Sequence, residues 1–267
     1  MLLEGKNAVI HGAGGAIGGA VARAFAREGA TVFLAGRTPA KLDAVANQVA
    51  STGRVAQTAQ VDALDEEAVE RHAEAVAEQA GSLDVSFNAV GLNNGEQGIP
   101  LVELPADDYL APITGYARTH FLTAKAAARH MMRQGSGVIM PLSVPMARVP
   151  AASSGSFGMA GAAVESFTRQ LAAEPGPYGI RVVCLRPTGI PETAARLGSH
   201  TREVWGRAAD RLGVPLEQLL DTIGSGGLRQ RPLTVDVVAN VAAFMASDRS
   251  SGMTATDANV TLGGVVD

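Results

Sequence analysis

Short apolar runs alternate along the chain with longer stretches in which Ala, Val, Leu and Phe recur at helical spacing. The short runs predict strands at residues 7–11, 31–35, 55–61, 83–88, 137–142, 181–185 and 259–262. The longer stretches predict helices at residues 17–28, 39–50, 65–80, 106–133, 157–174 and 234–247. Strands that are apolar throughout are typical of a parallel sheet with helices on both faces. The pattern therefore predicts an α/β fold with a doubly wound, parallel seven-stranded sheet.

The carboxyl ends of these strands are where chemistry is expected, because doubly wound sheets bind ligands beyond that edge. Segment 191–228 lies on this edge between the last two strands, and it has no strand character. It holds the only tryptophan, Trp205, and several glycines that include Gly198. A mobile lid over the ligand cleft is the favoured interpretation, and a structural excursion is the alternative. The length suits a single domain over residues 1–267.

The composition narrows the classes of partner. The chain has 26 acidic and 22 basic residues, a net charge of −4, and only 4% aromatic residues. These values indicate neither a cationic nucleic-acid surface nor base-stacking platforms, and they favour a small-molecule ligand. No run approaches the ~18 apolar residues of a membrane span and no signal peptide is evident, so we expect a cytoplasmic protein. The single cysteine, Cys184, lies in an apolar run and predicts a buried strand thiol, with no disulfide framework or metal cluster.

A glycine-rich loop follows the first predicted strand and opens the first helix. Residues 11–19 read His-Gly-Ala-Gly-Gly-Ala-Ile-Gly-Gly. Glycines at such a place let backbone N–H groups approach a pyrophosphate at the positive end of the helix. The strand before the loop and the amphipathic helix after it make nucleotide binding the favoured interpretation.

The end of the second strand indicates which dinucleotide is bound. An NAD-binding fold places a carboxylate there for the ribose 2′-hydroxyl, whereas this chain reads Gly36-Arg37-Thr38. The guanidinium of Arg37 can bind a 2′-phosphate through charge-assisted hydrogen bonds. The sequence therefore favours NADP(H) over NAD(H), and the alternative is a solvated arginine at a helix start.

With these residues the chain resembles the short-chain dehydrogenase/reductase family over almost its whole length. The loop is similar to the family's Thr-Gly-x-x-x-Gly-x-Gly, and Asp62 resembles the aspartate that contacts adenine. Residues 88–91 resemble the family's Asn-Asn-Ala-Gly, and residues 187–193 resemble the segment that flanks the nicotinamide. The resemblance implies a Rossmann-type fold, a small-molecule substrate, and a homodimer or homotetramer built on the fourth and fifth helices. The loop, the second strand and the resemblance together assign cofactor binding to Gly12, Gly14, Gly15, Ala16, Ile17, Gly18, Arg37, Thr38, Asp62, Ala63, Asn88, Ala89, Gly91, Pro187, Gly189, Ile190 and Thr193.

The family's catalytic motif, Tyr-x-x-x-Lys, is missing. Its flanking residues align without gaps and put Phe157 at the tyrosine position and Gly161 at the lysine position. Phenylalanine has no proton to give, and glycine cannot lower a neighbouring pKa. The family's serine falls on Val144, next to Ser143, and its helix-four asparagine falls on Tyr116. Restoring Tyr and Lys together is expected to need little backbone movement, with a clash between the long Lys side chain and packing adapted to Gly161 as the alternative.

Three side chains are candidate replacements for the lost proton relay. Tyr116 and His120 lie four residues apart on one predicted helix face, and Ser143 can donate to a carbonyl. Loss of the relay penalises ketone reduction, because alkoxide charge then develops opposite Phe157. An enone or iminium suffers less, since its charge delocalises or is already cancelled by the hydride.

Three functions therefore stay open. The first is an NADPH-dependent oxidoreductase that reduces an activated C=C, C=N or C=O bond with a proton source foreign to the family. The second is a non-redox isomerase or cyclase that uses the cofactor as a scaffold, and the third is a catalytically silent NADP(H)-binding or partner protein. Other polar residues receive structural interpretations: residues 65–67 as a helix start, Glu165 as a solvated charge, and residues 153–156 as a helix cap.

Overall fold

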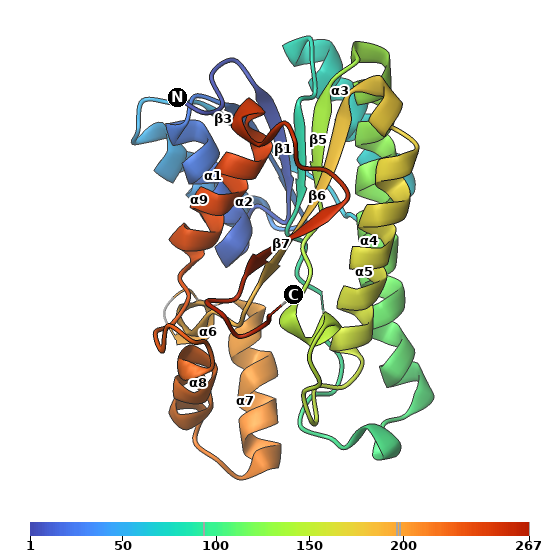
Figure 1. The fold of residues 1–267 in the computed structure, drawn as a ribbon. Helices are drawn as coiled ribbons and strands as arrows, with labels where there is room; N and C mark the ends of the chain where they lie inside the picture. Colours follow the sequence, from blue (N-terminus) through green and yellow to red (C-terminus); the bar gives the residue numbers. More distant parts are fainter. Residues whose placement is uncertain (93, 196, 198, 267) are drawn as a thin grey trace.

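The computed structural model of the chain describes residues 1–92, 94–195, 197 and 199–266. Its centre is one seven-stranded sheet in the order β3-β2-β1-β4-β5-β6-β7, and every neighbouring pair is parallel (Figure 1). The strands are β1 (Asn7–His11), β2 (Thr31–Gly36), β3 (Ala56–Gln60), β4 (Val85–Asn88), β5 (Gly137–Met140), β6 (Ile180–Pro187) and β7 (Thr256–Val260). The doubly wound single-domain fold predicted from the sequence is therefore confirmed.

Helices cover both faces of the sheet. One layer holds α1 (Ala16–Arg27), α2 (Pro39–Ala50) and α9 (Val235–Ala246), and the other holds α3 (Glu66–Ala80), α4 (Ala106–Gln134) and α5 (Phe157–Ala173) (Figure 1). Three further helices, α6 (Pro191–Ala195), α7 (His200–Leu212) and α8 (Leu216–Ser225), follow β6 and stand beyond the end of the sheet. Short 3₁₀ turns η1 (Leu101–Glu103), η2 (Pro145–Ala147), η3 (Gly176–Tyr178) and η4 (Asp248–Ser250) complete the chain.

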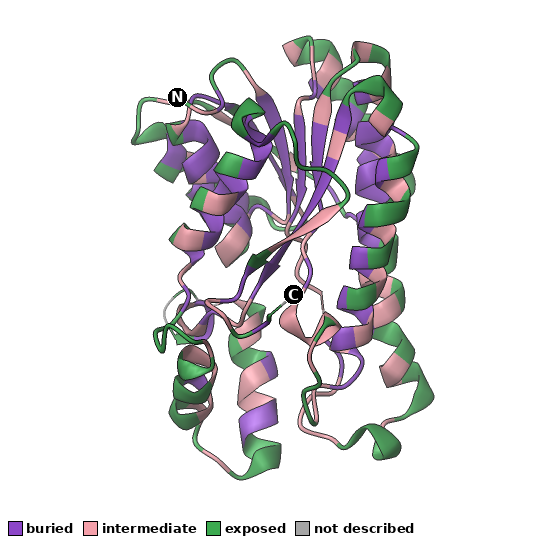
Figure 2. Cartoon of the chain, in the orientation of Figure 1, coloured by how far each residue is buried: buried purple, intermediate pink, exposed green. Residues whose placement is uncertain are grey.

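Two apolar layers hold this sandwich together, one on each side of the sheet. Phe25 of α1 and Phe87 of β4 belong to the first layer, where their rings meet edge to face at 6.5 Å. Val182 of β6 and Met131 of α4 belong to the second. Buried residues accordingly follow the strands and the inner helix faces in Figure 2. Side chains from both layers fully desolvate the central strands, which is why those strands read as unbroken apolar runs in the sequence.

The helices match their predicted positions to within a residue or two, whereas one strand was misplaced. The run at 259–262 predicted the last strand, but β7 occupies Thr256–Val260 and pairs Thr256 with Val183. The strand reads Thr-Asp-Ala-Asn-Val and lies at the edge of the sheet, so polar side chains interrupt the apolar signal. None of the described helices is both long enough and apolar enough to cross a membrane.

The fold gathers the predicted site at one edge. The strand order reverses between β1 and β4, and the loops after both strands open at the carboxyl end of the sheet. Doubly wound sheets bind their ligands at such a switch point. Segment 191–228, which forms α6, α7 and α8, stands over this edge.

Candidate active site

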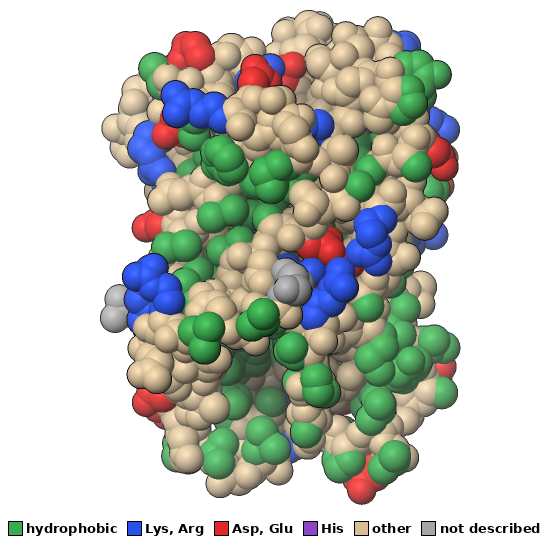
Figure 3. All heavy atoms as spheres, viewed as in Figure 1, with side chains coloured by type: hydrophobic (Ala, Val, Ile, Leu, Met, Phe, Trp, Pro, Cys, Tyr) green, Lys and Arg blue, Asp and Glu red, His purple; other side chains and the backbone are tan. Residues whose placement is uncertain are grey.

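A large cavity opens at the carboxyl edge of the sheet. Its volume is about 910 Å³, and its walls come from the loops after β1, β2, β4, β5 and β6 together with α7 and α8. In the space-filling view of Figure 3, hydrophobic side chains gather around a hollow in the lower half of the molecule. Small-molecule sites in proteins commonly have ~300–1,000 Å³, so the volume of this cavity is at the upper end of that range.

Nearly all of the predicted cofactor residues line this cavity. They come from loops far apart in the sequence, and the fold brings them together: Gly12, Gly14, Gly15, Ala16, Ile17, Arg37, Thr38, Asp62, Ala63, Ala89, Gly91, Pro187, Gly189, Ile190 and Thr193. Two predicted residues lie behind the wall instead. A Cβ on Gly18 would sit 2.4 Å from the carbonyl oxygen of Gly12, so Gly18 lets α1 pack against the loop. Asn88 is buried and binds Thr123 and the N–H of Val90, which shapes the turn after β4.

The glycine loop is packed as a dinucleotide-binding loop must be. Gly12 has φ +74°, and a Cβ there would lie 2.5 Å from the carbonyl oxygen of Ala89. Only glycine fits this conformation and this approach between the loops after β1 and β4. The first helix starts at Ala16, and no side chain caps it at Gly15. The positive end of α1 therefore faces the cavity with its N–H groups available to an anion, and the residues present fit a pyrophosphate.

Cations line the cavity beyond the end of β2. Arg37 follows β2 directly, and Lys41 lies one turn into α2. The guanidinium of Arg37 is exposed and forms no ion pair or hydrogen bond with another residue in the described part of the chain. The carboxylate of Asp62, by contrast, accepts a hydrogen bond from the N–H of Leu64 at 3.0 Å. This end of the cavity offers free positive charge to a phosphate.

The opposite half of the cavity is apolar. Tyr116, Phe157, Met146 and Trp205 line it, with aliphatic side chains from α7 and α8 between them. Among the described residues, the Lys, Arg, Asp and Glu side chains that line the whole cavity are Arg23, Arg37, Lys41 and Asp62, and the last of these lies in the loop just after β3. A ligand that fills the second half therefore meets no formal charge from those four residue types.

Val144, Phe157 and Gly161, the three positions that the family resemblance predicts as catalytic, all line the cavity with apolar side chains or none. Phe157, at the start of α5, faces the cavity, and its ring lies 5.6 Å from that of Tyr116. A Cβ on Gly161 would lie 2.6 Å from Cγ2 of Val144. Val144 therefore fills the space that a lysine stem at position 161 needs, and the alternative of a clash with packing adapted to glycine holds over the expectation of little movement.

The two aromatic candidates on α4 behave differently. Tyr116 lines the cavity, where its hydroxyl donates to Asn94 Oδ1 at 2.5 Å and accepts from the N–H of Leu92 at 3.3 Å. Desolvation raises the pKa of Tyr116 to about 12, so its proton is held tightly. His120 is buried behind the wall and bonds the carbonyl oxygen of Tyr116 and the N–H of Leu142. Burial lowers the pKa of His120 to about 4, and the imidazole is a neutral packing group.

Ser143 lies against a buried ion network. Its hydroxyl reaches Glu165 Oε1 at 3.0 Å and the carbonyl oxygen of Gly161 at 3.2 Å, and both are acceptors. The proton of Ser143 therefore points away from a substrate carbonyl. Glu165 also accepts from Arg186 at 2.6 Å and from Arg148 at 2.6 Å.

Glu165 is thus a buried charge, and its interpretation as a solvated one is wrong. Its side chain is 2% exposed, and that of its partner Arg186 is 1% exposed. The signal was present in the sequence: Glu165 stands four residues after Gly161 and eight after Phe157, which puts all three on one helix face. Asp257 of β7 extends the network, and burial raises the pKa of that carboxyl.

The predicted helix caps have opposite outcomes. Asp65 caps α3 by accepting from the N–H of Ala68 at 3.1 Å, as residues 65–67 predicted. Ser156 precedes α5, but its side chain makes no capping bond, and its oxygen is buried without a partner in the described part of the chain. Its backbone, at φ −90° and ψ 10°, lacks the extended conformation from which a serine reaches the next N–H groups.

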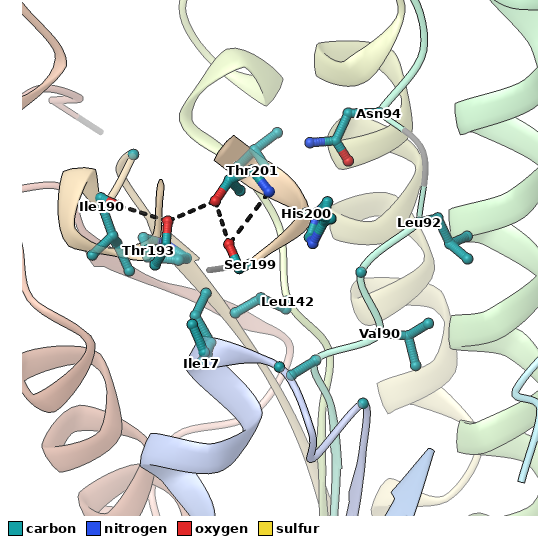
Figure 4. A pocket seen from close by; sticks show the side chains of 18 of the residues that line it. Ile17, Val90, Leu92, Asn94, Leu142, Ile190, Thr193, Ser199, His200 and Thr201 are labelled. Atoms are coloured by element: carbon teal, nitrogen blue, oxygen red, sulfur yellow. Dashed lines mark hydrogen bonds between the residues drawn. The ribbon is translucent and has the colours of Figure 1, made fainter. Parts of the chain in front are cut away.

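Segment 191–228 forms the outer wall of the cavity through α7 and α8, and Gly198 lies outside the described residues. His200, at the start of α7, was not singled out by the sequence. Figure 4 shows its imidazole pointing into the cavity, near Thr201 and on the side that faces Leu92. A Cβ on Gly91 would lie 2.4 Å from Cε1 of His200, so the ring packs directly on the loop after β4.

Comparisons with known proteins extend over nearly the whole chain. A family model described as enoyl-(acyl carrier protein) reductase matches residues 12–264. An uncharacterized oxidoreductase of Mycobacterium tuberculosis (strain CDC 1551 / Oshkosh) is 32% identical over 252 residues, which cover 94% of this chain and 89% of that protein. The short-chain reductase protein NovJ of Streptomyces niveus is 32% identical, with 79% and 82% covered. The solved structure of a short-chain type dehydrogenase/reductase from Mycobacterium marinum superposes with a TM-score of 0.80 at 25% identity, covering 99% and 97%.

Proposed function

This chain belongs to the short-chain dehydrogenase/reductase family, and we propose that it is an NADPH-dependent reductase of an uncharged, apolar small molecule that carries an activated double bond. Membership implies a nicotinamide cofactor, and bound NADPH supplies a hydride. The observation that carries the proposal is the apolar face that Val144, Phe157 and Gly161 present where the family keeps its proton relay.

The choice of NADP(H) rests on the cations beyond β2. Arg37 and Lys41 line the cavity, and Gly36 stands where a carboxylate would repel a 2′-phosphate. Charge-assisted hydrogen bonds contribute about 1.5–3 kcal/mol each, which corresponds to roughly ten- to a hundredfold in affinity. Arg37→Ala should therefore weaken NADPH binding by that factor and leave NADH binding nearly unchanged. Quenching of the single tryptophan, Trp205, provides the titration signal, because its ring lines the cavity.

The choice of substrate rests on the second half of the cavity. A ketone needs a strong acid close to its oxygen as the hydride arrives, and a positioned acid contributes about 10²–10⁴-fold. Phe157 cannot act as an acid, Tyr116 holds its proton with a pKa of about 12, and Ser143 directs its own proton to Glu165 or Gly161. A conjugated C=C bond spreads the charge over several atoms and depends less on that acid. The description of the matching family model, an enoyl reductase, agrees with this substrate class.

The test is NADPH consumption with a panel of apolar enones, imines and ketones. The proposal predicts turnover with the activated substrates and little with simple ketones. Product formed without NADPH loss would instead indicate an isomerase or cyclase. If quenching of Trp205 fluorescence shows that the cofactor binds, but no product forms and no NADPH is consumed, the protein is a catalytically silent binding protein.

A further inference from the structure

Reduction of a C=C bond consumes one proton as well as one hydride, and the family's proton donor is absent here. The described cavity residues that can titrate are His11, Tyr116 and His200, besides the charged groups Arg23, Arg37, Lys41 and Asp62. Burial and two neighbouring histidines lower the pKa of His11 to about 3, so that side chain is a neutral imidazole and not an acidic imidazolium at neutral pH. Tyr116 is committed to Asn94. His200 is the group that remains.

We propose that His200 is the proton donor of this reaction, in place of the tyrosine that Phe157 has replaced. The assignment rests on the proposed reductase function. Its imidazole points into the cavity and packs on Gly91 (Figure 4). The ring makes no hydrogen bond with another residue in the described ranges, so its N–H is free for a substrate.

The position of His200 connects it to the catalytic face. Gly91 precedes Leu92, whose N–H binds the hydroxyl of Tyr116, and the ring of Tyr116 lies 5.6 Å from Phe157. His200 on α7 and Phe157 on α5 both line this cavity. Because His200 is also solvent-exposed, its ring can take up a new proton from water after each turnover.

The step balances without any further reactant. The imidazolium N–H bond breaks, and a C–H bond forms at the α-carbon of the substrate while the β-carbon receives the hydride. The neutral imidazole then recovers a proton from solvent. Each turnover thereby consumes one NADPH and one proton.

The charges around His200 determine the expected pH dependence. Lys41 of α2 and Arg202 of α7 are the neighbouring cations, Glu203 of α7 is the neighbouring anion, and Gly91 brings no charge. Partial desolvation and then Lys41 lower the pKa of His200 from 6.5, whereas Glu203 raises it. Only the imidazolium donates, so kcat/KM should be constant at low pH and should fall tenfold per pH unit above that lowered pKa.

The experiment measures the pH profile of enone reduction by the full-length wild-type protein and by His200→Gln. Glutamine keeps a polar side chain but cannot act as an acid. We expect kcat/KM to fall by about 10²–10⁴-fold and the pH dependence to vanish, while NADPH affinity from Trp205 quenching stays within about threefold. Glu203→Gln is the matched variant outside the cavity, and it should shift the profile to lower pH.

Nuclear magnetic resonance provides a readout that is independent of turnover. The chain has five histidines, and His200→Gln identifies the imidazole signal of His200. The pKa of that signal should match the kinetic pKa, and Glu203→Gln should lower both. An unchanged profile in His200→Gln, or a loss of rate that merely follows a loss of NADPH affinity, would overturn this assignment alone. Absence of NADPH consumption by the wild-type protein would overturn the proposed function as well.

Discussion

Rebuilding the family's motif requires a change at Val144 in addition to Phe157→Tyr and Gly161→Lys. The Cβ of any residue at 161 would lie 2.6 Å from Val144 Cγ2 and 3.3 Å from Ala147 Cβ, and side chains do not tolerate the shorter approach. Overpacking of this kind costs about 1–3 kcal/mol. For a chain of this size each kcal/mol lowers Tm by roughly 2–4 °C, so the double variant should melt several degrees below the wild type.

Val144→Ser removes the conflict, because serine has one γ atom where valine has two and can leave the Cγ2 position empty. The triple variant should therefore recover most of the lost Tm and carry Ser, Tyr and Lys at the three aligned positions. A working acid contributes about 10²–10⁴-fold, and cyclohexanone reduction with NADPH should rise by that factor over the wild type.

Gly161→Ala tests the clash with Val144 by itself, since it adds the Cβ and nothing else. In a double-mutant cycle with Val144→Ser, the cost of Gly161→Ala should be about 1–3 kcal/mol in the wild-type background and near zero beside serine. Equal costs in both backgrounds would refute the steric reasoning. A triple variant that folds and binds NADPH but gains no ketone activity would refute the claim that the missing relay limits the chemistry.

Three further predictions address the lid, the ion network and pH. Hydrogen exchange should be fast across segment 191–228 in the free protein and slower with NADP⁺ and substrate bound, and equal protection would favour a fixed structural excursion. Glu165→Ala should lower the free energy of unfolding by about 1–3 kcal/mol in denaturant titrations, because Ser143 and Arg186 lose a buried acceptor while Asp257 still pairs with Arg186; a loss below about 0.5 kcal/mol would contradict this. His11 and His120 are neutral in the folded protein and take up a proton on unfolding below pH 6.5. The free energy of unfolding should therefore fall as the pH drops from 6.5 toward 4, by roughly 1.4 kcal/mol per pH unit for each histidine. A free energy of unfolding that does not change over this range would contradict the burial of the two side chains.

The strands, the helices and the residues that line the cavity after β1 and β2 could be predicted because local patterns determine them. Each apolar run predicts a strand and each stretch of helical periodicity predicts a helix. Gly12 and Arg37 come directly after their strands in the sequence, so their place at the end of the strand is predicted too. The edge strand β7 was misplaced because its polar residues carry no apolar run.

The other features depend on contacts between distant segments. The burial of Glu165 depends on Arg186, twenty-one residues later on another element. The clash at Gly161 arises from Val144, which lies on the loop after β5. His200 lines the cavity because the start of α7 packs against Gly91. The sequence around Glu165, Gly161 and His200 does not indicate which distant residue each of them contacts. The spacing from Phe157 to Glu165 indicates only that the two share a helix face.

The most direct measurement compares cyclohexenone with cyclohexanone, two uncharged rings that differ only in the conjugated C=C bond, by the loss of NADPH absorbance with the wild-type protein. We predict that NADPH is consumed with cyclohexenone, that the product is the saturated ketone, and that kcat/KM for cyclohexanone is lower by about 10²-fold or more. Equal rates with both substrates would mean that a working acid faces the carbonyl despite Phe157 and Gly161. Loss of NADPH with cyclohexanone alone would contradict the account outright.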